Sequence, residues 1–270
     1  MDGHPATHID NETLNVIEQR SSTRAFAKDA EGRALAPTDG QRDAVLHAAS
    51  RAPSAGAMMM YSIIDIRKQE TLDKLAVLCD SQPMIAHAPW ALVFVVDYAK
   101  WIDLFERAGC FTDEFTAQSG KTPRRAPGLG EFAIAAQDAV IAAQNAVIAA
   151  EAVGLGSCYI GDIVEHAEDV AELLHLPEYT VPLTMLILGT PAKDRAPIAH
   201  PVENLVMPEH YRRADTAVLD AQIAEMDSMF RPHAVCAGER VRDIYTRKHT
   251  SEFMAEMCRS VEIWLKRWAG

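Results

Sequence analysis

The sequence predicts an α+β fold, in which short strands and helices alternate around one long helix made mostly of alanine. The long helix is indicated by three segments, AAQDAVI, AAQNAVI and AAEAV, that follow one another at a seven-residue step from residue 135. The strands are indicated by four short apolar runs rich in β-branched residues. These runs are Tyr61–Ile66, Trp90–Asp97, Tyr159–Asp162 and Val181–Leu188. With 270 residues and 49% hydrophobic composition, the chain can bury a substantial core.

Helical periodicity, capping residues and helix breakers place the shorter helices. Asn11 or Thr13 caps the first helix, and Pro53 ends the second. The segments predicted as helices are Leu14–Gln19, Gln41–Arg51, Glu70–Cys79, Ala167–Leu174, Glu209–Met229 and Arg240–Trp268. Residues 98–130 are aromatic and rich in Gly and Pro, which indicates a mobile insertion or lid. We expect one domain over residues 1–206 and a C-terminal helical arm over 207–270.

The long helix is predicted over Phe132–Val153, about 33 Å at 1.5 Å per residue. Its polar positions repeat at Gln137, Gln144 and Glu151, and most of the remaining circumference is apolar, so we expect the helix to be buried. A coiled coil is one interpretation, but coiled coils use large apolar residues with charged flanking positions over several heptads. Here the repeat is short, its side chains are small and it is almost uncharged. The pattern favours the central helix of a globular core or of a subunit interface.

The composition excludes several classes of protein. The net charge of −12 argues against nucleic acid and anionic membranes as partners. The five cysteines lack paired spacing, and the ten histidines include no HExxH or other metal-ligand pattern, so we expect neither a disulfide framework nor a metal site. No signal peptide is evident, and the apolar run Trp90–Val96 is too short to span a bilayer. We expect a cytoplasmic protein.

Three short segments have residues suited to ligand binding. Arg20–Arg24 offers two guanidinium groups and three hydroxyls, which suit a dianionic phosphate, although a solvated turn has the same composition. Pro53–Ala57 is a small-residue loop before a strand, where backbone can approach a ligand closely. Gly154–Asp162 follows the long helix and is not a GxGxxG nucleotide motif, because no strand precedes its glycines.

Together these motifs resemble the FMN-dependent nitroreductase family. The resemblance covers about Leu14 to Val206 and rests on QRSSTRAF, APSAGA, AHAPWALVFVVD, GLGSCYIGDI and LGTPA, in that order. It implies a nitroreductase-like fold, with a central, mainly antiparallel sheet flanked by helices around the long buried helix, and a C-terminal helical extension. It also implies a homodimer with the flavin at the interface and the long helix in the dimer core.

The resemblance implies distinct roles for the motifs. The first would hold the flavin phosphate and ribityl chain, the loop after the second helix would lie along the flavin of the partner subunit, and backbone amides at Gly161 and Asp162 would address the flavin N5 and O4 edge. The implied cofactor-binding residues are Arg20, Ser21, Ser22, Arg24, Pro53, Ser54, Ala55, Gly56, Ala57, Met59, Cys158, Ile160, Gly161 and Asp162. No side chain is expected to act as a dedicated acid or base, because the flavin performs the chemistry.

The sequence departs from the family pattern at two places. Ala57–Tyr61 replaces the polar residues that many members carry after the Pro-Ser loop, and the basic phosphate contact after the last strand has three candidates: Lys193, Arg195 and His200. Cys158 is either redox-active beside the flavin or, as its type favours, a packing residue.

The function implied is an FMN-dependent oxidoreductase that takes electrons from NADH or NADPH and reduces nitroaromatics, quinones or related small acceptors in a ping-pong cycle. Alternatives are a flavin-dependent reductive dehalogenase or metabolite dehydrogenase, and a non-catalytic flavin-binding regulator or scaffold.

Overall fold

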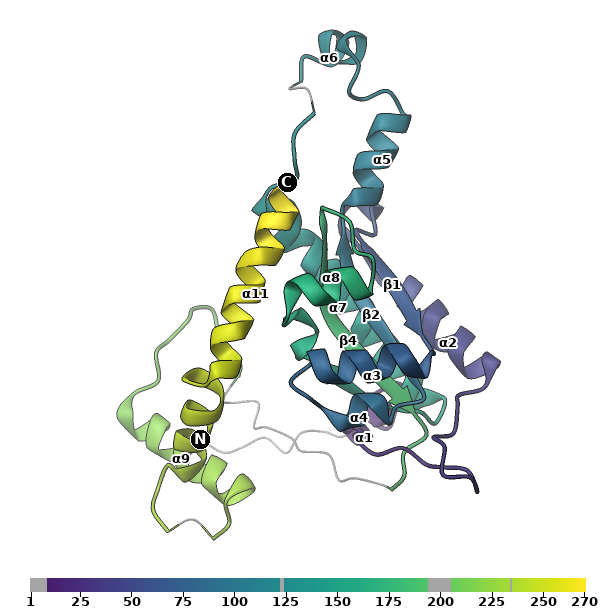
Figure 1. Cartoon of the computed structure of the whole chain (residues 1–270). Coiled ribbons are helices and arrows are strands. Elements are labelled where there is room, and N and C mark those ends of the chain that lie inside the picture. The colour runs from purple at the N-terminus through teal and green to yellow at the C-terminus, as the bar shows by residue number, and fades with distance from the viewer. Residues whose placement is uncertain (1–8, 122–123, 194–204, 234) are drawn as a thin grey trace. The chain divides into compact units, whose positions relative to one another are not determined.

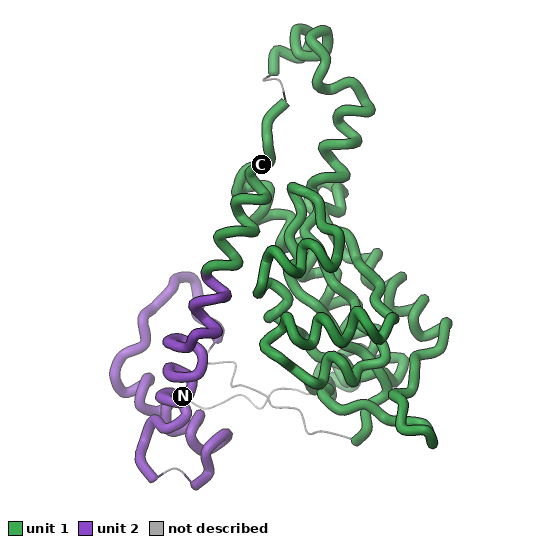
Figure 2. Tube along the Cα trace, viewed as in Figure 1, with its two compact units in different colours: residues 1–197, 259–270 green, residues 198–258 purple. Residues whose placement is uncertain are grey.

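The computed structural model describes residues 9–121, 124–193, 205–233 and 235–270. The chain divides into two compact units, shown in Figure 2. Unit 1 comprises residues 1–197 and 259–270, and unit 2 comprises residues 198–258. The motifs identified in the sequence all lie in unit 1.

Unit 1 is built on a four-stranded antiparallel sheet with the order β1-β2-β4-β3. The strands are β1 (Tyr61–Ile66), β2 (Trp90–Asp97), β3 (Gly156–Ile160) and β4 (Thr180–Gly189). The two central strands, β2 and β4, are almost entirely buried, which explains their continuous apolar sequences. The predicted α+β class and antiparallel sheet are therefore confirmed. β3 begins earlier than predicted, and Gly161 and Asp162 belong instead to a 3₁₀ turn, η2 (Gly161–Val164).

The long helix is α7 (Leu129–Ala152), which packs along the sheet and contacts all four strands (Figure 1). Its inward side consists mainly of alanines, including Ala139, Ala142 and Ala146, whose small side chains let the helix approach the sheet closely. Within the single chain the helix is buried on one side only, because Ile134, Val140 and Ile141 are 44%, 47% and 39% exposed. An alanine-rich helix is apolar on every side, so its sequence did not reveal which side packs.

Shorter helices complete unit 1. They are α1 (Glu12–Gln19), α2 (Asp39–Ser50), η1 (Ala55–Ala57), α3 (Gln69–Leu78), α4 (Pro83–Ala86) and α8 (Ala167–Leu173). The Asn11 side chain caps α1 by accepting from the amides of Thr13 and Leu14, as the sequence predicted for one of its two candidates. α2 packs against α7, while α3 and α8 lie over the opposite face of the sheet in Figure 1.

The insertion contains two helices that the sequence reading missed, α5 (Ala99–Arg107) and α6 (Asp113–Ser119). They extend beyond the end of the sheet (Figure 1). Aromatic side chains hold this region together, with Phe105 packed near both Trp101 and Phe111. α5 does carry an apolar stripe, formed by Trp101, Ile102 and Phe105, but the Gly and Pro residues of the insertion as a whole favoured a loop.

Unit 2 contains α9 (Thr216–Phe230), α10 (Glu239–Ile244) and the π-helical turn η4 (Tyr245–His249). α11 (Glu252–Ala269) begins in unit 2, and its last part belongs to unit 1. The predicted single helix Arg240–Trp268 is therefore wrong, because it is interrupted at Thr250 and Ser251.

The C-terminal residues are fixed within unit 1 by two buried tryptophans. The Trp264 indole donates to the Val164 carbonyl, and the Trp268 indole donates to the Gly128 carbonyl, both at 2.9 Å. A buried indole with its N–H paired contributes a large apolar contact area without an unsatisfied donor. Trp264 and Trp268 thus belong to the core of unit 1.

Within the described ranges, α7 is the one helix whose length and hydropathy alone would allow it to cross a membrane. A core helix that packs on an apolar sheet has the same properties.

Candidate functional site

The Arg20–Arg24 motif lies against the sheet edge formed by β3. The Thr23 amide donates to the Ser157 carbonyl at 2.8 Å, and Ser22 pairs with Ser157 in a parallel bridge. Further along, the Ala27 amide donates to the Thr190 carbonyl, and the Ala192 amide donates to the Ala25 carbonyl. The structure thus brings together the first motif, the segment after α7 and the end of β4, as a shared backbone scaffold.

The contact between these segments depends on Gly156. A Cβ atom at this position would lie 2.1 Å from Thr23 Oγ1 and 2.7 Å from Thr23 Cβ, far inside van der Waals contact. Glycine is therefore required here because it has no Cβ atom and lets the two segments approach closely. The φ angle at this position is not unusual, so backbone conformation is not the reason. The Thr23 side chain fills the space and is only 6% exposed.

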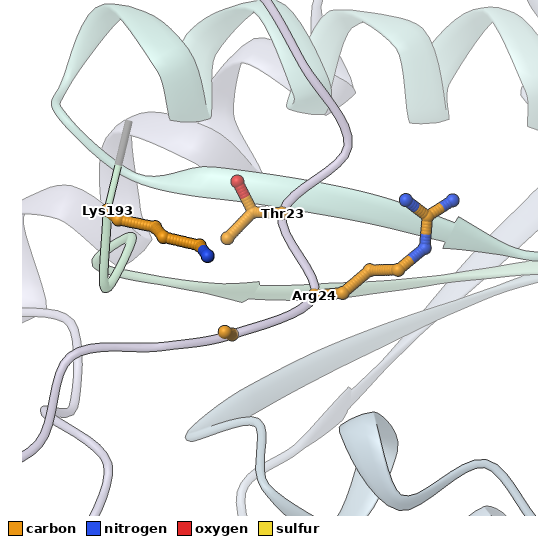
Figure 3. A pocket seen from close by; sticks show the side chains of 4 residues that line it. Thr23, Arg24 and Lys193 are labelled. Atoms are coloured by element: carbon orange, nitrogen blue, oxygen red, sulfur yellow. The ribbon is translucent and has the colours of Figure 1, made fainter. Parts of the chain in front are cut away.

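A cavity of about 220 Å³ opens at this junction, lined by Thr23, Arg24, Ala25 and Lys193. Figure 3 shows Lys193 reaching toward Thr23, while the Arg24 guanidinium points the other way along the strand. Lysine and arginine side chains at one cavity suit a phosphate group, and Arg24 would have to rotate its side chain to reach the same phosphate as Lys193. Of the three candidates for the second basic contact, the structure places Lys193 here, and Arg195 and His200 lie outside the described residues.

Arg20 has a different environment from Arg24. Its charge acts on Tyr159 and on Glu151 at the end of α7. Burial raises the pKa of Tyr159 to about 12, and the Arg20 charge partly opposes this shift. Burial likewise raises the pKa of Glu151, again opposed by Arg20. The two guanidinium groups of the motif therefore lie in separate environments: Arg20 is near Tyr159 and Glu151, and Arg24 is at the cavity.

Tyr159 belongs to this region although the sequence reading left it out. It lies on the exposed face of β3, where its hydroxyl donates to Gln144 Oε1 on α7 at 3.2 Å. The neighbouring predicted residues Cys158 and Ile160 point the opposite way and are 4% and 1% exposed, so their side chains pack in the core. Side chains alternate between the two faces of a strand, so Tyr159 could have been separated from Cys158 and Ile160 in the sequence. A predicted strand that begins at Tyr159 is too short to show this alternation.

Gly161 and Asp162 begin the 3₁₀ turn that follows β3. Gly161 is exposed, and the Asp162 carboxylate accepts a hydrogen bond from the Gln82 side chain at the start of α4. The turn is fixed through this pair and through the Glu165 amide, which donates to the Asp162 carbonyl.

The Pro53–Met60 loop lies at another place along α7. Pro53, Ala55, Gly56 and Ala57 are exposed, Met59 is 48% exposed, and Met60 is buried in the core. The Asp138 carboxylate on α7 accepts from the Ala55 amide at 3.0 Å and from the Met60 amide at 3.4 Å. Of the three methionines in the loop, Met59 is thus the most exposed, and Met58 is half-buried.

The loop and the arginine motif are well separated in a single chain. Asp138 holds the loop, while Arg20 lies near Glu151, thirteen residues further along α7. At a rise of about 1.5 Å per residue, this spacing corresponds to roughly 20 Å along the helix.

Known proteins share this architecture. The solved structure of B. megaterium NfrA1 superimposes with a TM-score of 0.77 at 26% sequence identity, covering 96% of this chain and 99% of that one. An oxygen-insensitive NADPH nitroreductase of Salmonella typhimurium is 33% identical over 193 residues, which are 70% of this chain and 73% of the relative. An FMN reductase [NAD(P)H] of Bacillus subtilis is 30% identical over 186 residues, 69% of this chain and 68% of the relative.

The fold is therefore the nitroreductase fold, and the protein is an oxidoreductase. The Nitroreductase family model matches residues 17–190, and the chain belongs to that family. The family uses FMN with NAD(P)H as electron donor. The match includes all the implied cofactor-binding residues from Arg20 to Asp162, and the resemblance inferred from the motifs is confirmed.

Proposed function

We propose that this chain is an FMN-dependent NAD(P)H oxidoreductase that reduces nitroaromatics, quinones or related small acceptors by ping-pong hydride transfer. The observation that carries the proposal is the cavity that Arg24 and Lys193, from distant segments of the chain, both line beside the backbone scaffold of β3. A cationic cavity with a hydroxyl donor suits the phosphate end of FMN in an otherwise acidic protein.

The remaining motifs then have consistent tasks. Arg24, Lys193 and the hydroxyls of Ser21 and Ser22 would hold the phosphate and ribityl chain, and the backbone of Gly161 and Asp162 would donate hydrogen bonds to the N5 and O4 edge. When bound, FMN supplies the two-electron chemistry between NAD(P)H and the acceptor. Fixed amide donors at that edge stabilise negative charge without further reorganisation of the protein.

We further propose that the chain acts as a homodimer through the outer face of α7. Ile134, Val140 and Ile141 form an exposed apolar stripe on this face, with Gln137 and Gln144 along it. Contiguous exposed apolar surface of this kind typically marks a protein interface. A two-fold axis near Gln144, midway between Asp138 and Glu151, would place the loop of one chain beside the arginine motif of the other.

Such a dimer would allow the loop and the arginine motif to contact the same flavin, although they lie far apart within one chain. The Pro53–Met60 loop lies roughly 20 Å along α7 from the Arg20 region, and it is exposed. Its contact with flavin is therefore assigned to the flavin of the partner subunit. The insertion, with an aromatic cavity of about 260 Å³ that includes Phe105, Phe111 and Phe115, is assigned to control of acceptor access.

Anaerobic titration of the FMN-loaded protein with NADH and with NADPH tests the enzyme assignment. Bleaching of the flavin absorbance, followed by reoxidation with a nitroaromatic or a quinone, is expected. Flavin that stays oxidised with both donors contradicts the assignment and favours a regulator or scaffold. Reoxidation by one halogenated compound or one metabolite, and not by the broader panel, favours the dehalogenase or dehydrogenase alternative.

We place the enzyme in the cytoplasm, in keeping with its five free thiols.

A further inference from the structure

The Pro53–Met60 loop has an unusual backbone conformation for its sequence. Gly56, Ala57 and Met59 have φ angles of 59°, 56° and 47°, all in the left-handed region. This region is readily accessible to glycine but unfavourable for alanine and methionine, because their Cβ atoms crowd the neighbouring carbonyl. The conformation therefore has to be maintained by contacts outside the loop.

Asp138 supplies two of these contacts, one at each end of the strained segment. Its carboxylate, on α7, accepts from the amides of Ala55 and Met60, and the residue is 3% exposed. Hydrogen bonds to an ionised acceptor are stronger than those between neutral groups. A buried carboxylate that brackets four loop residues in this way fixes both the position and the curvature of the loop.

A neighbouring lysine balances the buried charge. Lys100, at the start of α5, donates to the Tyr61 carbonyl at 2.5 Å, and its charge interacts with Asp97 and Asp138. Burial lowers the pKa of Lys100, while the two carboxylates oppose that shift. The same negative charge adds to the effect of burial in raising the pKa of Tyr61. Asp138 is thus accommodated as part of a local charge network.

The insertion holds the loop from a second direction. The indole N–H of Trp101, also on α5, donates to the Met58 carbonyl at 2.9 Å, in the middle of the strained segment. Within the loop, the Met59 amide donates to Ser54 Oγ at 3.0 Å. The loop is therefore attached both to α7 and to the base of the 98–130 insertion.

We propose that Asp138 is a positioning residue for FMN: it holds the Pro53–Met60 loop in the conformation that contacts the flavin of the partner subunit, with Trp101 as the second anchor. This inference rests on the proposed function, since it concerns how the loop of the same flavin site is shaped. It gives a task to a buried carboxylate in a helix that consists mainly of alanine, valine and isoleucine.

The test compares Asp138→Asn with a matched change on the same helix, Asn145→Ala. Asn145 donates to the Ala48 carbonyl at 3.1 Å, so its replacement also removes a hydrogen bond between α7 and backbone but leaves the loop untouched. In Asp138→Asn, the amide group turns a donor toward one of the two loop amides. FMN affinity is measured by quenching of flavin fluorescence, and exchange of the Ala55 and Met60 amide hydrogens is measured in the FMN-free protein.

Asp138→Asn is expected to weaken FMN binding roughly ten- to a hundredfold and to speed exchange of the Ala55 and Met60 amides. Asn145→Ala is expected to change FMN affinity by less than about twofold, even where it lowers the melting temperature. Equal FMN affinity and unchanged amide exchange in folded Asp138→Asn would overturn the proposal. If wild-type protein binds no FMN, the proposed function fails, whereas the amide-exchange comparison still reports on whether Asp138 holds the loop.

Trp101→Phe keeps the inference testable if Asp138→Asn does not fold. This change keeps an aromatic ring but removes the donor to the Met58 carbonyl. A weaker FMN affinity at an unchanged melting temperature is expected, and unaltered affinity would remove Trp101 as an anchor and count against loop positioning.

Discussion

The backbone amide of Thr23 donates a 2.8 Å hydrogen bond to the carbonyl of Ser157. This bond joins the Arg20–Arg24 motif to the first residues of β3, although the two segments lie far apart in the sequence. It places the candidate phosphate-binding groups beside the strand that leads to Gly161 and Asp162. The close approach at this point gives the first prediction.

Gly156→Ala is expected to disturb this junction. The new Cβ would lie 2.1 Å from Thr23 Oγ1, so the Thr23 segment has to move, at a cost of about 1–3 kcal/mol in unfolding free energy. FMN affinity is expected to fall with it, because Thr23 and Arg24 line the same cavity. Gly130→Ala, at an open position in α7, serves as the control and is expected to be neutral or slightly stabilising. Denaturant titration and FMN titration of both variants check this expectation.

Arg24→Ala and Lys193→Ala are each expected to weaken FMN binding by about 1.5–3 kcal/mol, because each removes a charged donor to the phosphate. The melting temperature of the FMN-free protein should stay unchanged, since both side chains are exposed. Arg33→Ala removes the same charge from a surface pair with Asp29 and Glu31 and should leave the affinity intact. A loss of affinity as large in Arg33→Ala would indicate a general charge effect instead of a phosphate site.

Ile141→Glu is expected to convert the dimer to a monomer, because it places a charge in the exposed apolar stripe of α7. Val77→Glu, at a 66% exposed position on α3, should leave the dimer intact. Ala142 is fully buried in its own chain, so Ala142→Leu should lower stability by about 1–3 kcal/mol through overpacking and says little about the dimer. Sedimentation velocity distinguishes these cases, and a monomeric wild-type protein would contradict the dimer proposal.

The raised pKa of Tyr159 predicts that the folded protein loses stability at alkaline pH. Its pKa is raised from the ordinary value of 10 to about 12 in the folded state, chiefly by burial. The folded protein therefore holds this proton more tightly than the unfolded chain. The resulting stabilisation is complete below pH 10 and is lost as the pH rises through about 12. Wild type should lose more unfolding free energy across this interval than Tyr159→Phe, as measured by urea unfolding at a series of pH values; parallel curves would contradict the shifted pKa.

Much of the fold follows from local patterns in the sequence. Trp90–Asp97 reads as a buried strand because every position is apolar or terminal, and the structure gives β2 the same limits. The repeats of α7 likewise predict a long helix, but their near-uniform apolarity conceals which side meets the sheet. α5 was missed although Trp101, Ile102 and Phe105 form an apolar stripe, because the Gly and Pro residues of the insertion favoured a loop, and α6 is short and mostly exposed.

The candidate site, like the fold, could be predicted from the sequence only in part. Arg24 was identified from its own motif, whereas the place of Lys193 at the same cavity became evident only when the end of β4 was placed beside Thr23. Asp138 could be recognised as a polar position in an apolar helix, but its bonds to Ala55 and Met60 depend on the packing of α7 against the loop. Local sequence therefore indicates the groups, and tertiary packing decides which of them meet.

The most direct test of flavin binding is the absorbance spectrum of the purified protein after incubation with FMN and removal of free flavin. A yellow protein that retains about one FMN per chain is predicted, since each chain provides one cavity lined by Arg24 and Lys193. A colourless protein with no retained flavin would contradict the account.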